Sequence, residues 1–272
     1  GLTIHKFGVK KLEPGIIESG YIKNEAALVA VLKDLVKELR VATAKVSLPE
    51  ERMYLFKTEV PTKNLDEIRQ NIEFKLEEDV PIPPTEALFF FDLLPAEISS
   101  SKNIVSVSVA PKDLVNFYLK VLESANLSVI GFQVQPKAIA RAVVSPDNKE
   151  TLMLIHTMGK KVGLHIVCGE VVCFTSTITL IEENDLITLK REINRVIDYW
   201  NEYGQGGTIK KIILSGKASI EISKDPTLSP DPSIPVEIGQ IWRNAFSNNH
   251  YIPPIPFENS LEYAIAAGLA LP

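Results

Sequence analysis

Val80-Pro81-Ile82-Pro83-Pro84 stands at the centre of the stretch that decides the fold of this chain. The preceding residues, 64–79, place apolar side chains at helical spacing, and Asn64 with Glu67 forms a capping-box pattern at their start. Prolines cannot continue a helix, so the prolines of this stretch end it and hold the chain extended. The apolar run 87–94 that follows predicts a strand.

A second strand and a second helix complete this part of the sequence. Residues 104–110 form another apolar run, which stops at Pro111-Lys112-Asp113, where a helix with one apolar face begins. Helix, proline-rich stop, two strands and a proline-started helix together predict a small α+β module inserted into a larger domain.

The flanks of the module are also regular. They contain an extended segment at 2–12, a helix after Asn24, strands at 44–48 and 129–134, and a short helix at 138–144, while a further strand at 55–60 lies before the helix of the module. Ser145-Pro146-Asp147-Asn148 has the composition of a loop and predicts the boundary between two halves of the chain.

The second half begins with strands. Three β-rich runs cover 152–155, 163–168 and 171–179, and Gly169-Glu170 suits a tight hairpin between the last two. A long helix at 185–203, a buried strand at 211–214 and a small-residue helix at 262–271 follow. Strands grouped before helices in both halves predict a two-lobed α/β protein.

Composition excludes several classes of protein. The chain has 272 residues, 45% of them hydrophobic, and a net charge of −5, so no basic field favours nucleic acid. The two cysteines, Cys168 and Cys173, are too few for a disulfide framework or a metal cage, and the four histidines lack metal-ligand spacing. No apolar run is long enough to span a bilayer, so we expect no direct membrane insertion.

Eight stretches resemble the PilM family, the cytoplasmic actin-like proteins of type IV pilus assembly, in the same order. They are Glu13–Ile22, Leu65–Pro84, Val109–Asp113, Gly131–Val143, Leu189–Trp200, Ile212–Ser219, Pro235–Ile241 and Tyr263–Leu271. The second resembles a helix that ends in an "IPFP"-like turn, and the third resembles an "AAPKE" junction. The likeness covers nearly the whole chain, although each motif alone is weak.

The resemblance implies an actin-like, ribonuclease H-like fold of two lobes with the α+β module inserted in the first. By this reading residues 1–148 form the first lobe, with a base at 1–49 and 129–148 and the insert at 50–128. Residues 149–272 form the second lobe, with a subdomain at about 180–240 and a core-packing C-terminal helix at 262–271.

Actin-like ATPases hold phosphate with two glycine-rich hairpins, each led by an aspartate that orients Mg²⁺ and its water. The residues that match the second hairpin begin with His156 in place of aspartate and Met158 in place of glycine, followed by Gly159, Lys160 and Lys161. Residues that match the first hairpin are not present in this sequence, which opens at Gly1-Leu2-Thr3.

The adenosine loop also departs from the family, since a "GGG"-like run becomes Gly216-Lys217-Ala218 and Gln135 replaces an acidic residue. We therefore expect no catalytic residue, no metal site and no ATP hydrolysis. Weak binding of ATP with Mg²⁺ stays open because Lys160 and Lys161 could attract phosphate.

The resemblance implies a scaffold that grips the N-terminal cytoplasmic tail of a PilN-like bitopic inner-membrane protein. The expected groove residues are Phe74, Val80, Ile82 and Phe90, with Leu88 as a weaker candidate. Such a protein is cytoplasmic, lies at the inner membrane through its partner, contacts other pilus platform proteins, and has self-association as an open possibility.

Three alternatives remain at this point. The chain could be an actin-like ATP-binding switch, an FtsA-like cell-division protein, or the cytoplasmic part of a type II secretion protein. The FtsA-like reading expects a charged linker and an amphipathic membrane helix after the fold, whereas this sequence closes with Gly268-Leu269-Ala270-Leu271-Pro272.

Overall fold

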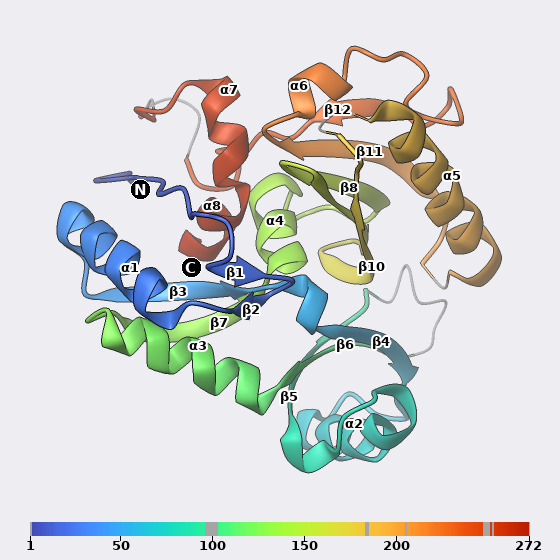
Figure 1. Ribbon diagram of the computed structural model, residues 1–272. Coiled ribbons are helices and arrows are strands. Elements are labelled where there is room, and N and C mark those ends of the chain that lie inside the picture. Colours follow the sequence, from blue (N-terminus) through green and yellow to red (C-terminus); the bar gives the residue numbers. More distant parts are fainter. Residues whose placement is uncertain are drawn as a thin grey trace.

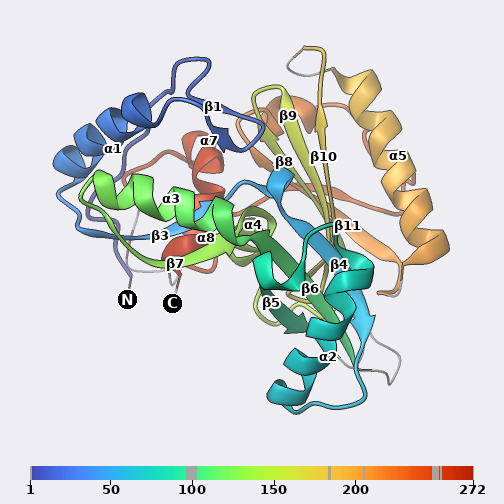
Figure 2. The same cartoon turned by 60° about the horizontal axis from the view of Figure 1, so that its bottom comes forward.

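The computed structural model describes residues 2–95, 103–182, 185–204, 206–246, 251 and 253–271. Gly1, the first residue of the predicted first lobe, and Pro272, the last of the predicted second lobe, lie outside the described residues. Two lobes are visible, with the helix α4 between them (Figures 1 and 2).

The base of the first lobe contains two short strands, a parallel strand pair and its helices. Its elements are β1 (Ile17–Glu18), β2 (Tyr21–Ile22), α1 (Glu25–Leu39), β3 (Thr43–Leu48), α3 (Lys112–Ser124), β7 (Ser128–Val134) and α4 (Gln135–Val143). Strands β3 and β7 pair in parallel, although the whole insert separates them in sequence. The short helix predicted at 138–144 is α4, which begins earlier than predicted, directly after β7, with Pro136 in its first turn.

The inserted module has the predicted helix, proline-rich stop and two strands, whereas α3, predicted as its last element, packs on α1 of the base through Val121. It contains the 3-10 turns at Glu50–Arg52 (η1) and Pro84–Glu86 (η2), the helix α2 (Leu65–Asp79), and the strands β4 (Tyr54–Glu59), β5 (Ala87–Leu93) and β6 (Ile104–Pro111). Asn64 caps α2 by accepting from the backbone N–H groups of Asp66 and Glu67. The strands form an antiparallel sheet in the order β4-β6-β5.

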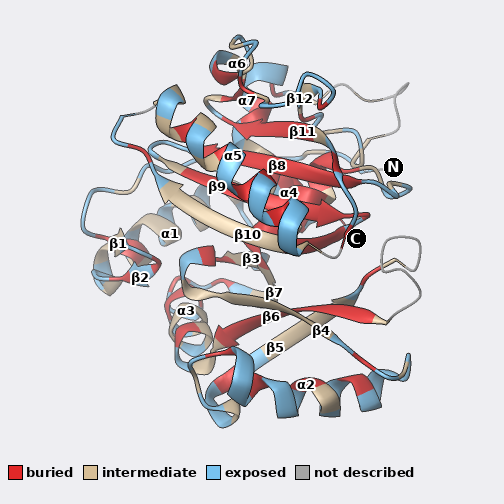
Figure 3. Ribbon diagram, turned by 90° about the vertical axis from the view of Figure 1, so that its right-hand side faces the viewer, coloured by how far each residue is buried: buried red, intermediate tan, exposed pale blue. Residues whose placement is uncertain are grey.

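Successive side chains of β6 point alternately to the two faces of the module sheet, and the two faces differ in character. Val105, Val107 and Val109 pack with Ile68 and Ile72 of α2 in the core of the module. Ser106 points to the other face, and its hydroxyl donates to the backbone O of Val172 in the second lobe at 2.6 Å. The second face of the module sheet is therefore the one turned towards the second lobe (Figure 3).

The second lobe is built on one five-stranded sheet in the order β10-β9-β8-β11-β12. The elements are β8 (Thr151–Met158), β9 (Lys161–Cys168), β10 (Val171–Thr179), α5 (Leu186–Tyr203), β11 (Ile209–Gly216), α6 (Ser219–Ile222) and β12 (Val236–Ile238). Residues 180–240, expected to be a subdomain, contribute β11 and β12 to this same sheet, parallel to β8. The predicted hairpin at Gly169-Glu170 is confirmed, and Gly169 adopts a φ of 66°.

Helices cover both faces of this sheet. Leu189, Ile193 and Trp200 of α5 pack on one face, whereas Ile139 and Val143 of α4 pack on the other. The C-terminal helix predicted at 262–271 is shorter than expected. The α-helix α8 covers only Ala264–Ala270; a 3-10 turn at Leu261–Tyr263 (η3) precedes it, and the short helix α7 (Phe257–Ser260) begins directly after Pro256.

Candidate functional site

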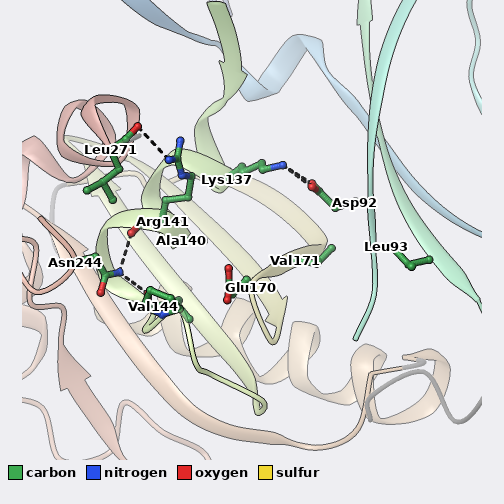
Figure 4. A pocket seen from close by; sticks show the side chains of 11 residues that line it. Asp92, Leu93, Lys137, Ala140, Arg141, Val144, Glu170, Val171, Asn244 and Leu271 are labelled. Carbon is green, nitrogen blue, oxygen red and sulfur yellow. Dashed lines mark hydrogen bonds and ion pairs between the residues drawn. The ribbon is translucent and has the colours of Figure 1, made fainter. Parts of the chain in front are cut away.

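A pocket of about 490 Å³ lies where α4, the module and the second lobe meet (Figure 4). We call it the α4 pocket. Asp92 and Leu93 of β5 line one side, and α4 lines the other. The remaining wall comes from the β9–β10 hairpin, the segment after α4, and the loop and helix near the C-terminus; the lining residues are Lys137, Ala140, Arg141, Val144, Pro146, Glu170, Val171, Asn244 and Leu271.

An ion pair joins the two sides of the α4 pocket. Lys137 Nζ lies 2.5 and 2.7 Å from the two carboxylate oxygens of Asp92, and about a third of each side chain is exposed. Because water reaches the pair, it contributes little to stability, on the order of 1 kcal/mol or less.

The wall beside α4 is held in place by hydrogen bonds. Asn244 Nδ2 donates to the backbone O of Arg141 at 2.8 Å and of Val144 at 2.5 Å, which satisfies carbonyls at the end of α4. Arg141 Nη2 donates to the backbone O of Leu271 at 3.1 Å. This side of the pocket is therefore ordered by contacts between segments that are distant in sequence (Figure 4).

The outer edge of β5 lies beside the pocket. Leu94 N donates to Ile104 O at 2.8 Å, so the backbone groups of Asp92 and Phe90, at the same phase of the antiparallel ladder, also point to β6. The N–H and C=O groups of Leu93 and Phe91 point the other way. Within the described ranges no strand pairs with this edge, so Leu93 offers free backbone groups at the pocket.

The five residues expected in a groove lie at different places. Phe74 is 81% exposed on α2, whereas Val80 is 6% exposed and packs with Ile82 in the core of the module. Leu88 is 40% exposed and Phe90 is half-buried; both lie on β5, on the same face as Asp92. None of the five lines the α4 pocket. The sequence analysis did not single out Asp92; an acidic residue within the apolar run 87–94 could have drawn attention to it.

In the loop aligned above with the second phosphate hairpin, polar side chains bind other residues of the protein. His156 Nδ1 lies 2.9 Å from Ser215 Oγ, and Gln135 Nε2 donates to Met158 Sδ at 3.1 Å. Gly159 turns between β8 and β9 with a φ of 60°. Lys160 Nζ donates to Ile181 O at 2.6 Å, and Lys161 forms an ion pair with Glu51 of η1.

The loop that matches the adenosine site packs against the same hairpin. Gly216 has a φ of 89°, and a Cβ there would lie 2.1 Å from Thr157 O. Thr157 Oγ1 accepts from Ala218 N at 3.0 Å, so a backbone donor at the start of α6 is already used. Lys217 is exposed. The two loops are thus held together by their own hydrogen bonds.

A buried group of ionisable residues lies on the face of the second-lobe sheet that α4 covers. His156 and His165 point to this face, and Glu50 reaches it from η1. Burial raises the pKa of Glu50 to about 8, assisted by Glu51. Burial lowers the pKa of His165 to about 3, assisted by His156, and that of His156 to about 4. Sequence analysis missed Glu50 and His165; the alternation of 163, 165 and 167 in β9 was the available signal.

Among the described residues no group of three or more potential ligands could hold a metal ion. In the same part of the chain, no helix combines the length and the apolar character that crossing a membrane requires.

Comparison with known proteins shows which solved structures share this fold. No family model matches the chain, and no curated protein matches it. Among solved structures, a PilM–PilN type IV pilus biogenesis complex is similar over 96% of this chain and 89% of the other, with a TM-score of 0.77 and 19% identity.

A second solved structure is the cytoplasmic domain of EpsL, an inner-membrane component of the type II secretion system of Vibrio cholerae. The similarity covers 88% of this chain and 80% of that domain, with a TM-score of 0.50 and 11% identity. The predicted actin-like fold is confirmed, and so is the resemblance to PilM at the level of the fold.

Proposed function

We propose that this chain is a PilM-like scaffold of a type IV pilus machine that binds the cytoplasmic tail of a PilN-like membrane protein. The observation that carries the proposal is the α4 pocket beside the free backbone groups of Leu93. The similarity in fold to PilM, solved in a complex with PilN, supports the same assignment.

The geometry suits an extended tail better than a folded partner. A tail that lies along the outer edge of β5 would form backbone hydrogen bonds with Leu93 and Phe91 and alternate its side chains across the edge. Apolar side chains would contact Ala140, Val144 and Val171 in the α4 pocket, and a polar one would reach the Lys137–Asp92 pair. Binding would order the tail, so its affinity is reduced by that entropy cost.

On this proposal the chain works in the cytoplasm at the inner membrane, through its partner. Other pilus platform proteins would gather on the same partner, and self-association of this chain is compatible with that arrangement.

Titration of this chain with a peptide tests the proposal. The peptide carries the cytoplasmic tail of the PilN-like protein encoded in the source genome, and a scrambled peptide is the control. In a Leu93→Pro variant the free N–H at the edge is lost but the ladder to β6 is not, so we expect binding to weaken by about tenfold. Leu93→Ala, which keeps the N–H, is the matched variant for the lost side chain.

Equal affinity of the true and scrambled peptides, with the protein folded, would contradict the proposal. If Leu93→Pro and Leu93→Ala weaken binding to the same extent, the tail binds but does not pair with β5. Circular dichroism of both variants verifies that the fold is intact.

We further propose that the chain does not hydrolyse ATP. His156 leaves no carboxylate to orient Mg²⁺ and its water, and Lys161 is already paired with Glu51. We expect no phosphate release above the background rate with ATP and Mg²⁺, measured by a coupled assay. Hydrolysis that requires Mg²⁺ and disappears in a Lys161→Ala variant would contradict this.

A type II secretion protein is the second candidate, since the cytoplasmic domain of EpsL has a similar fold. The same titration distinguishes the two when it includes the cytoplasmic segment of a type II secretion partner from the same genome. Preference for that segment would move the assignment to the secretion machine.

A further inference from the structure

Glu50 and His165 meet at the boundary between the two lobes. Glu50 lies on η1, between β3 and β4, and one carboxylate oxygen is 3.6 Å from Nε2 of His165 on β9. Both side chains are almost completely buried. Among the described residues, neither carboxylate oxygen of Glu50 has a hydrogen-bond partner, and Nε2 of His165 has none either.

The surroundings leave these atoms facing each other. His165 Nδ1 lies 2.9 Å from Thr175 Oγ1, so the hydroxyl of β10 occupies the other ring nitrogen. Gly163, two residues earlier in β9, provides the space: a Cβ there would lie 2.5 Å from His165 Nε2 and 3.4 Å from Glu50 Oε1. Within the described part of the chain, the two groups therefore face each other without another polar partner.

We propose that Glu50 and His165 form a proton-controlled latch between the lobes, closed while they share one proton and open once it is lost. With the proton on Glu50, the neutral carboxyl group faces Nε2 at 3.6 Å and needs only a small approach to donate to it; with the proton on His165, the two groups form an ion pair. Both arrangements are neutral as a pair. Without the proton, a carboxylate and a ring lone pair face each other in a buried site, which is strongly unfavourable.

Charged groups from every neighbouring element act on the latch. Glu51, on the same turn as Glu50, disfavours a second negative charge, whereas Lys161 of β9 favours it. His156 of β8 disfavours a charge on His165. Arg52 lies over the ring of Tyr21, and burial, with a smaller effect of Glu51, raises the pKa of Tyr118 on α3 to about 12. The pKa of Glu50, about 8, places release of the proton at mildly alkaline pH.

Apolar contacts also hold the module against the second lobe, since Leu94 and Ile104 belong to the same buried core as Cys173. The described polar contacts are the hydrogen bond from Ser106 to Val172 O, the Lys161–Glu51 ion pair, and Lys57 of β4 at 4.5 Å from the ring centroid of Trp200. Strands β4 and β10 are both edge strands and do not pair with each other. Water can therefore reach Glu50 if this boundary opens.

Distance measurement between spin labels tests the latch. Glu77→Cys on α2 and Asn201→Cys on α5 place labels on exposed positions, while the native Cys168 and Cys173 are buried. We expect the distance distribution to shift to longer values between pH 6.5 and 9 and to return on acidification. Glu50→Gln, which has the same shape but no charge to release, should keep the short distance at both pH values.

Glu51→Gln is the matched control. It leaves Glu50 in place but removes the neighbouring negative charge, so the opening should persist with its midpoint at lower pH. No change of distance in the protein with native Glu50, or the same change in Glu50→Gln, would overturn the latch. Circular dichroism at each pH separates opening from unfolding. The result does not depend on which partner binds the α4 pocket.

Discussion

A Gly268→Ala variant is expected to be destabilised by at least about 3 kcal/mol, although alanine normally favours a helix over glycine by up to about 1 kcal/mol. Gly268 lies in α8 where this helix crosses α4. A Cβ at this position would lie 1.7 Å from the backbone O of Ala138 and 2.6 Å from its carbonyl carbon. Backbone atoms cannot rotate away as a side chain can, so the helices must separate.

Separation is costly because α4 is fixed on its other sides. Ile139, Val143 and Ala140 of this helix pack with strands of the second-lobe sheet, and α8 contributes Ala264 and Ala267 to the same core. The loss is a large part of the roughly 5–15 kcal/mol by which a domain is stable.

Denaturant unfolding of Gly268→Ala and Gly131→Ala measures this effect. Gly131 in β7 has no atom within 4 Å of an added Cβ, so its variant should remain within about 0.5 kcal/mol of the parent protein. Equal stability of the two variants would mean that α4 and α8 are not in close contact in solution.

The second large effect is a stability maximum near pH 6.5 that the buried ionisable group creates. Between pH 6.5 and 4.5 the unfolded chain holds protons on His156 and His165, whereas the folded chain holds the one on Glu50. The unfolded state therefore binds one more proton, and stability falls by about 1.4 kcal/mol per unit as the pH decreases. Over the two pH units from 6.5 to 4.5, which we call the acid limb of the stability curve, the free energy of unfolding falls by about 3 kcal/mol.

Above pH 6.5 the sign reverses. The folded chain keeps the proton on Glu50 up to a pKa of about 8, whereas the unfolded chain has lost all three. Stability then falls by about 1.4 kcal/mol per unit as the pH increases, for a total of about 2 kcal/mol. Urea unfolding at half-unit intervals from pH 4.5 to 8.5 measures both limbs.

Glu50→Gln separates the contributions. Without the Glu50 proton the alkaline limb should disappear, and the acid limb should steepen to about 2.7 kcal/mol per unit because the unfolded state then binds two more protons. Glu51→Gln should keep an alkaline limb. An alkaline limb that persists in Glu50→Gln would assign it to another group.

Local pattern was enough for most elements of this fold. The helix 65–79 with Asn64 as its cap, its proline-rich end, and the hairpin at Gly169-Glu170 all depend on neighbours in sequence, and all are confirmed. Element ends were less predictable. The helix α4 starts at Gln135 because it follows β7 directly, and the last α-helix begins only at Ala264, after a 3-10 turn.

The α4 pocket could not be predicted in the same way. Lys137 and Asp92 are 45 residues apart, and their contact requires the module to lie against α4. Sequence reasoning looked for a groove near the prolines and chose Val80 and Ile82, which the tertiary structure places in the core of the module under α2. Apolar periodicity reports that a side chain is buried, but not whether its neighbour is a core or a ligand.

The sequence by itself predicted the two-lobed α/β architecture and the order of elements around the prolines, because these follow from spacing and residue type. Only the tertiary structure decided that Lys161 is neutralised by Glu51, that Glu50 meets His165, and that β5 keeps a free edge beside α4. Those properties depend on distances between segments far apart in the chain, and packing of the lobes sets these distances.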